Sequence, residues 1–111
     1  MAQNKTILII DDHTLFREGL RAIIERNPGY EVIGEAGSSR EGLQIVEKYK
    51  PDLVLVDISL PDRSGIELTR DIIKLSSKTR IMIVSMHSKT DYIVKAFQAG
   101  ATGYVIKESA A

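Results

Sequence analysis

The stretch Leu53-Val54-Leu55-Val56-Asp57-Ile58-Ser59-Leu60-Pro61-Asp62 is the segment from which the fold of this 111-residue chain can be worked out. Its four consecutive aliphatic residues predict a strand that is buried on both faces, and Asp57 marks the point where that strand leaves the core. Pro61 and Gly65 then predict a loop. One acid at a strand end is an ordinary surface feature, so its meaning depends on which residues end the other strands.

The composition of the whole chain excludes several classes of protein. The length suits one domain with a single core, and the absence of cysteine excludes disulfides and thiolate metal sites. Fifteen basic and fifteen acidic residues cancel, so no overall charge predicts contact of this domain with DNA or with a membrane. No stretch approaches the ~18 apolar residues of a membrane span, and the N-terminus does not resemble a signal peptide, so we expect a cytoplasmic location.

Apolar patterns alternate along the chain between strand-like runs and helical repeats. The strand-like runs occupy residues 6–10, 30–36, 53–57, 80–84 and 102–106. Between them apolar residues recur at helical spacing, as Phe16, Leu20, Ile23 and Ile24 do. Capping-box spacing at Ser38 and at Ser64 marks two helix starts. The short connections predict an α/β fold with a doubly wound parallel five-stranded sheet, commonly in the flavodoxin-like order 2-1-3-4-5.

Polar residues end four of the five predicted strands at the same edge of this sheet. These residues are Asp11 and Asp12, Asp57, Ser85 and Lys107. Each alone has a simple structural explanation, such as acids at a helix N-terminus, a loop hydroxyl or a solvated lysine. Together they predict three carboxylates, one hydroxyl and one ammonium at the crevice where such sheets bind ligands.

A carboxylate cluster of this kind calls for a counter-charge. Two carboxylates ~4 Å apart repel by roughly 4 kcal/mol at an effective dielectric near 20, and a hard divalent cation such as Mg²⁺ offsets this repulsion. An ionised carboxylate can also attack phosphorus as a nucleophile, while the ammonium and the hydroxyl bind phosphoryl oxygens. We find no histidine or cysteine placed near another strand end as a base. The set therefore predicts phosphoryl chemistry at an acidic Mg²⁺ site.

These residues resemble the receiver domain of bacterial two-component response regulators, with the CheY-like form of the flavodoxin-like fold. The resemblance covers nearly the whole chain, residues 1–111, and includes Asp57-Ile58-Ser59-Leu60-Pro61, Gly65 and Gly100-Ala101-Thr102-Gly103-Tyr104. Residues 11–20 and 103–107 are similar to the NarL/FixJ-like, LuxR-type regulators. Such regulators usually carry a helix-turn-helix DNA-binding domain after the receiver, so we expect one in the parent protein.

The resemblance implies a role for each polar residue. Asp57 is the expected phospho-acceptor. Mg²⁺ is expected to bind directly to Asp12, Asp57 and the backbone carbonyl of Ser59, and through water to Asp11. The other implied roles are the binding of phosphoryl oxygens by Lys107 and Ser85, the switch aromatic by Tyr104, and tuning of the phosphate lifetime by Ser59 and His87.

The implied function is a phosphorylation-controlled signalling switch rather than an enzyme with a separate substrate. A sensor histidine kinase would phosphorylate Asp57, and the change would alter self-association, with a dimer expected, and the activity of an attached DNA-binding domain. One alternative is a Mg²⁺-dependent phosphohydrolase that forms an aspartyl-phosphate, which the lack of a second acid two residues after Asp57 disfavours. The other is a pseudo-receiver interaction module, which the complete acid set disfavours.

Two features depart from the family pattern at the C-terminal end. Many receivers have a proline with a cis bond after the lysine, whereas this chain has Glu108, so we expect a trans bond there. The sequence ends at Ala111, where a fifth helix would begin. We therefore expect the fifth helix to be truncated and an apolar face beside the first helix to lie open, covered by dimerisation or by rearrangement of another element.

Overall fold

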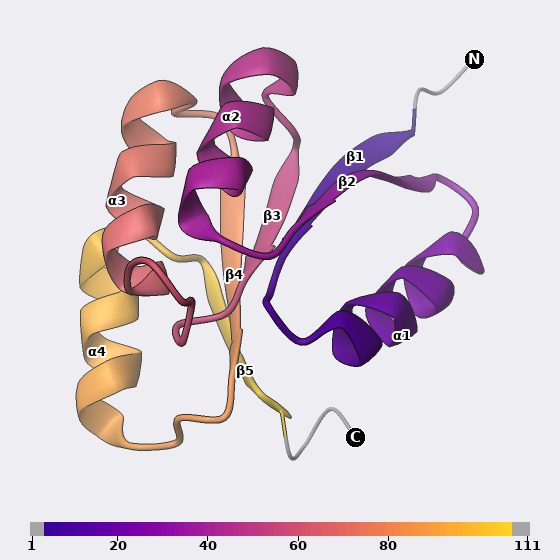
Figure 1. Ribbon diagram of the computed structural model, residues 1–111. Coiled ribbons are helices and arrows are strands. Elements are labelled where there is room, and N and C mark those ends of the chain that lie inside the picture. Colours follow the sequence, from indigo (N-terminus) through magenta and orange to yellow (C-terminus); the bar gives the residue numbers. More distant parts are fainter. Residues whose placement is uncertain (1–3, 108–111) are drawn as a thin grey trace.

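Five parallel strands form one sheet in the order β2-β1-β3-β4-β5 (Figure 1). The computed structural model describes residues 4–107. The strands are β1 (Lys5–Ile10), β2 (Tyr30–Ala36), β3 (Leu53–Val56), β4 (Arg80–Ser85) and β5 (Gly103–Ile106). The predicted doubly wound parallel sheet and its strand order are confirmed, with each strand within two residues of its expected bounds.

Helices cover both faces of the sheet (Figure 1). They are α1 (Thr14–Glu25), α2 (Ser39–Tyr49), α3 (Gly65–Leu75) and α4 (Thr90–Ala99). Helix α1 lies alone on one face, and the other three lie on the opposite face. Within residues 4–107, no helix is long and apolar enough to cross a bilayer.

The core has two layers because successive strand residues point to opposite faces. Leu8, Val56 and Ile83 belong to the layer under α2, α3 and α4, and each is fully buried. Ile9 and Leu55 belong to the other layer, which packs against the half-buried side chains of α1. The unbroken aliphatic runs in the sequence follow from this burial on both faces.

The apolar stripe of α1 is narrower than the sequence suggested. Phe16, Leu20 and Ile24 pack against the sheet at i, i+4 and i+8. Ile23, which we included in the stripe, is 57% exposed. The side chains that pack against the sheet form a single row, and Ile23 lies one residue off that row.

The predicted helix starts are confirmed, although the capping boxes are incomplete. The Ser38 hydroxyl accepts a hydrogen bond from the Glu41 backbone N–H, and the Ser64 hydroxyl accepts one from the Ile66 backbone N–H. The Glu41 carboxylate accepts from the Ser38 hydroxyl instead of its backbone N–H. The Glu67 carboxylate pairs with Arg63. Each helix therefore gains the serine cap without the reciprocal glutamate bond.

The face of the sheet beside α1 is more covered than we expected. Leu55 and Val84 are 8% and 5% exposed, and Met82 and Val105 are half-buried. The expected trans bond before Glu108 and the expected start of a fifth helix fall at 108–111, which lie outside the described residues. Dimerisation through this face stays a prediction.

Candidate functional site

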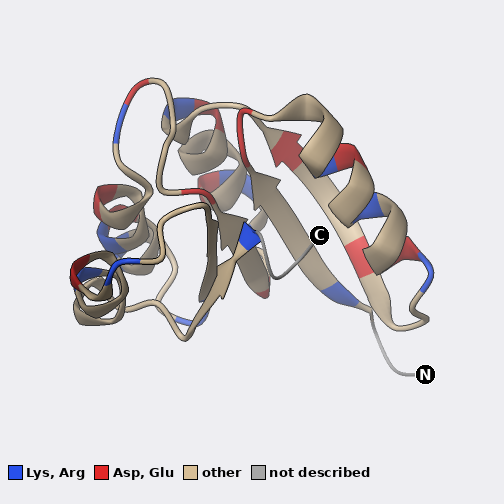
Figure 2. Cartoon of the chain, turned by 90° about the horizontal axis from the view of Figure 1, so that it is seen from below, with Lys and Arg blue, Asp and Glu red and all other residues tan. Residues whose placement is uncertain are grey.

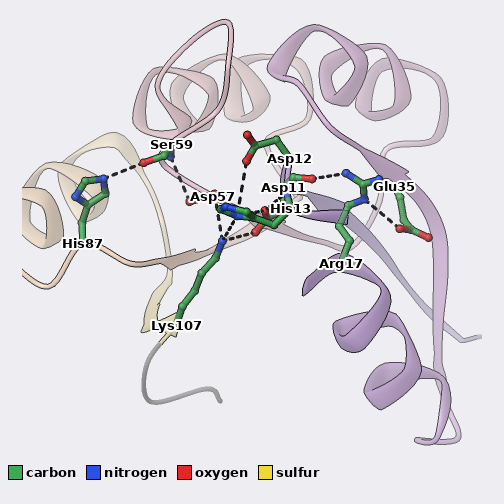
Figure 3. Close-up of polar contacts among 9 residues, drawn as sticks. All are labelled: Asp11, Asp12, His13, Arg17, Glu35, Asp57, Ser59, His87 and Lys107. Carbon is green, nitrogen blue, oxygen red and sulfur yellow. Dashed lines mark hydrogen bonds and ion pairs between the residues drawn. The ribbon is translucent and has the colours of Figure 1, made fainter. Parts of the chain in front are cut away.

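The carboxyl ends of β1, β3 and β5 bring Asp11, Asp57 and Lys107 together (Figure 3). Ile10 pairs with Val56 in the parallel register, and the Asp57 backbone N–H donates to the Ile10 carbonyl at 3.0 Å. The two acids that follow these strands therefore lie side by side. The Lys107 Nζ lies 2.8 Å from Asp11 Oδ2 and 3.3 Å from Asp57 Oδ2. In Figure 2, acidic and basic segments are spread over the helices and loops, and some lie at the ends of the strands.

All three of these charged side chains are buried. The exposed fractions are 3% for both carboxylates and 6% for the lysine. Burial raises the pKa of the Asp57 carboxyl, and the charge of Asp11 raises it further, whereas Lys107 and the backbone N–H of Ser59 oppose the rise. The single ammonium of Lys107 therefore forms ion pairs with two buried carboxylates.

Asp12 and His13 complete a cluster at the mouth of the site. Asp11, Asp12, His13 and Asp57 each offer one ligand atom, and these atoms all lie within 4.8 Å of one another. The carboxylate oxygens suit a hard divalent cation, and the cluster holds more negative charge than Lys107 balances. The acidic pocket is thus compatible with Mg²⁺.

His13 is the residue of this cluster that sequence reasoning missed. Its Nδ1 lies 3.2 Å from Asp11 Oδ1, 3.1 Å from Lys107 Nζ and 3.9 Å from Asp57 Oδ2. Our interpretation that no histidine lies near another strand end was therefore wrong. The available signal was its position directly after Asp12. In the structure His13 is the N-cap residue of α1, and its side chain makes no capping hydrogen bond.

The other predicted site residues meet at His87, beside the cluster. The His87 Nε2 lies 2.9 Å from the Ser59 hydroxyl, and its ring stacks on Tyr92 with centroids 4.2 Å apart. The His87 backbone N–H donates to the Ser85 hydroxyl at 3.1 Å. The Tyr104 hydroxyl donates to the His87 carbonyl at 2.7 Å. His87 therefore joins the loop after β3, the end of β4, helix α4 and strand β5.

Ser85, the second predicted phosphoryl-binding residue, ends β4 at the same edge of the sheet as Asp57. It is fully buried, and within residues 4–107 its hydroxyl hydrogen bonds to neither Asp57 nor Lys107. The Ser59 backbone N–H, by contrast, donates to Asp57 Oδ1 at 3.2 Å. The loop after β3 is thus already tied to the candidate acceptor, and Ser85 is tied to His87.

Asp62 anchors the far end of the same loop, and the sequence did not indicate this role. Its carboxylate accepts hydrogen bonds from the Ser39 backbone N–H at 2.9 Å, the Ser39 hydroxyl at 2.8 Å and the Arg40 backbone N–H at 3.1 Å. The side chain thereby caps α2 from another element. Gly65 closes the loop against Asp57, because a Cβ at this position would lie 2.1 Å from the Asp57 carbonyl oxygen.

Comparison with known proteins places this geometry in a family. The family model described as the response regulator receiver domain matches residues 7–111. Over 102 residues the chain is 39% identical to the transcriptional regulatory protein DegU of Brevibacillus brevis, covering 92% of this chain and 43% of DegU. The chain thus spans about half the length of the curated relatives that it matches.

Solved structures agree with the sequence comparison. A LuxR-family two-component response regulator from Aurantimonas sp. SI85-9A1 is 43% identical with a TM-score of 0.89, covering 95% of this chain and 75% of that one. A Burkholderia pseudomallei response regulator, solved with a phosphorylated aspartic acid, a calcium ion and citrate, is 30% identical with a TM-score of 0.86. It covers 94% of this chain and 60% of that one. The chain belongs to the response regulator receiver domain family and is similar to its LuxR/NarL-type members.

Proposed function

We propose that this receiver domain is a switch controlled by phosphorylation of Asp57. A carboxylate oxygen of Asp57 attacks the phosphorus of a phosphohistidine on a sensor histidine kinase, the P–N bond breaks, and the imidazole leaves. Hydrolysis later returns the carboxylate and inorganic phosphate. The observation that carries the proposal is the position of Asp57, which is buried at a strand end between the acids of β1 and the ammonium of Lys107.

The neighbouring residues have distinct tasks in this reaction. Asp11, Asp12, Asp57 and the Ser59 carbonyl would hold Mg²⁺, which when bound neutralises charge on the phosphoryl oxygens. Lys107 already lies 3.3 Å from Asp57 Oδ2 and would balance the charge of one phosphoryl oxygen. No separate base is needed, because an ionised carboxylate is the nucleophile.

Ser85 and Tyr104 provide the link from the site to the surface. The Ser85 hydroxyl can donate to a phosphoryl oxygen while it still accepts from the His87 backbone N–H, so a shift of Ser85 towards Asp57 moves the His87 segment with it. The His87 carbonyl accepts from Tyr104, so movement of this segment releases the tyrosine ring to turn inward. Ser59 and His87, which contact each other beside Asp57, would control how water reaches the phosphoryl group and hence its lifetime.

The relatives indicate what the switch controls. DegU is named as a transcriptional regulatory protein and NarL as a nitrate/nitrite response regulator, and this chain covers 43% and 48% of their lengths. We therefore propose that the parent protein carries a helix-turn-helix DNA-binding domain after the receiver, works in the cytoplasm, and changes its self-association when Asp57 is phosphorylated.

Incubation with acetyl phosphate and Mg²⁺, followed by intact mass measurement, tests the proposal. We expect one added phosphoryl group that disappears in Asp57→Asn and remains in Asp71→Asn, a surface acid paired with Arg63. Catalytic release of phosphate from a panel of phosphate esters would instead indicate a phosphohydrolase. A protein that is folded but never modified would indicate an interaction module.

A further inference from the structure

Arg17 connects the backbone of Asp11 to the edge strand of the sheet (Figure 3). Its Nη1 donates to the Asp11 carbonyl oxygen at 2.5 Å, and its Nε donates to Glu35 Oε1 at 3.1 Å. Arg17 comes from the first turn of α1, and Glu35 comes from the end of β2. Both side chains are mostly buried, with 17% and 22% exposed. The guanidinium therefore bridges two elements directly behind the acidic cluster.

Every polar atom of Asp11 has a partner in this arrangement. Its backbone N–H donates to the Ala36 carbonyl at 2.9 Å, and its carbonyl accepts from Arg17. Its Oδ1 accepts from the His13 backbone N–H at 2.8 Å, and its Oδ2 lies 2.8 Å from Lys107 Nζ. The contact with Arg17 is the one that fixes the peptide unit between Asp11 and Asp12, and so the direction in which the Asp12 carboxylate leaves the chain.

Glu35 orients Arg17 from the other side. Hydrogen bonds from Arg21 and then from Arg17 lower the pKa of the Glu35 carboxyl, although burial opposes this, so the side chain stays ionised near neutral pH. Arg21 Nη1 lies 2.6 Å from Glu35 Oε2, and Arg21 also contacts Glu25, but it makes no hydrogen bond to Asp11 within residues 4–107. Arg21 thus shares the carboxylate of Glu35 without touching the site.

We propose that Arg17, oriented by Glu35, is a positioning residue that holds the Asp11–Asp12 turn in its cation-binding geometry and so sets the affinity of the site for a divalent cation. This inference rests on the proposed metal-dependent phosphorylation of Asp57. Groups that orient metal ligands typically contribute about 10–100-fold to metal affinity. Arg17 acts on a backbone carbonyl rather than on a ligating atom, so we expect the lower end of that range.

The test compares Arg17→Ala with Arg21→Ala as a matched control. Both remove one guanidinium from Glu35, but only the first removes the contact with Asp11. For Arg17→Ala we expect the Mg²⁺ dissociation constant, measured by titration well below the unfolding temperature, to rise roughly tenfold. The control should stay within about twofold of the wild type, as surface substitutions usually do. Glu35→Gln should fall between the two.

Two further measurements separate positioning from a general loss of structure. With acetyl phosphate, the Mg²⁺ concentration that gives half the maximal rate should rise in Arg17→Ala, while the rate at saturating Mg²⁺ stays near that of the wild type. Hydrogen exchange of the His13 amide should become faster in Arg17→Ala and not in Arg21→Ala. If Arg17→Ala does not fold, Glu35→Gln and Arg17→Lys are measured in the same way, and an unchanged dissociation constant in both contradicts the inference.

The outcomes also separate this inference from the proposed function. Wild-type Mg²⁺ affinity in folded Arg17→Ala, with Asp57 still phosphorylated, overturns the inference and leaves the proposed function standing. Equal losses of Mg²⁺ affinity in Arg17→Ala and Arg21→Ala overturn it as well. The loss would then come from removing a guanidinium from Glu35, and not from removing the contact with Asp11. A wild-type protein that neither binds Mg²⁺ nor accepts a phosphoryl group overturns both.

Discussion

Replacing Asp62 with asparagine is expected to destabilise the fold by an amount that depends on pH. The carboxylate of Asp62 caps α2 through Ser39 and Arg40 while it ends the loop that follows Asp57. The hydrogen bond from the Ser39 backbone N–H is the main cause that lowers the pKa of Asp62 from 3.8 to about 2. An asparagine oxygen can still accept one of these hydrogen bonds, so the variant removes mainly the charge.

The size of the effect follows from that pKa difference. A carboxyl group with a pKa of 3.8 in the unfolded chain and about 2 in the folded protein contributes up to about 2.4 kcal/mol above pH 5. The Asp62 side chain is exposed, so solvent screening reduces this to about 1 kcal/mol. Because the folded pKa is the lower one, the contribution is complete at neutral pH, about half remains at pH 3, and it disappears as the pH falls through about 2.

Urea unfolding of the wild type and of Asp62→Asn at pH 7 and pH 3 measures this contribution. Asp71→Asn is the matched control, because it removes a partly exposed carboxylate that pairs with Arg63 on the surface. We expect the control to change stability by less than about 0.5 kcal/mol. Equal stability of Asp62→Asn and the wild type at pH 7, or a difference that does not shrink at pH 3, would refute the reasoning.

Three further substitutions test the site. Gly65→Ala should destabilise the protein by about 1–3 kcal/mol in urea unfolding and should slow phosphorylation, because its Cβ would clash with the Asp57 carbonyl. Gly19→Ala is the control, because a Cβ at Gly19 has no atom within 4 Å, and equal effects of the two substitutions would contradict this prediction. His13→Ala should weaken Ni²⁺ binding more than Mg²⁺ binding in calorimetric titrations, since imidazole favours later transition metals; parallel losses would show that Nδ1 is no ligand. Lys107→Met should lower the free energy of unfolding by about 3–5 kcal/mol at pH 7, because it leaves two buried carboxylates unpaired. The pKa of Asp57 is raised, so protonation of this carboxyl should make the loss of stability smaller at pH 4.5, and a loss independent of pH would exclude this cause.

The sheet and the buried part of the site were predictable because both follow from burial and topology. Strands that are covered on both faces need unbroken aliphatic runs, and these runs mark the positions of β1, β3 and β4 in the sequence. Once the strands are parallel, the residues after them share one edge. The meeting of Asp11 and Asp57 is then a consequence of strand order, and the long side chain of Lys107 reaches them from β5, beyond β4.

The contacts made by loops and helix surfaces were not predictable in this way. Asp62 lies 23 residues from Ser39, and no local pattern tells which helix N-terminus a loop acid will reach. Arg17 has the pattern of an ordinary polar residue of an amphipathic helix, although its guanidinium lies behind the site. The Ser85 hydroxyl accepts from the His87 backbone N–H, a contact between neighbouring loop residues that no sequence pattern indicated.

The distribution of contacts around the acceptor explains how one phosphoryl group can move the proposed switch. The ammonium of Lys107 lies nearer to Asp11 than to Asp57, at 2.8 Å against 3.3 Å, so charge added on Asp57 draws it towards the acceptor. The links from Ser85 to His87 and from His87 to Tyr104 are single hydrogen bonds, each with a net value of about 0.5–1.5 kcal/mol. Reversing a two-state equilibrium from 1:99 to 99:1 needs about 5.5 kcal/mol of differential interaction. Three charge-assisted hydrogen bonds to a phosphoryl group, at about 1.5–3 kcal/mol each, supply about 4.5–9 kcal/mol, and this range includes the required difference because the contact between Tyr104 and His87 that must break is weak.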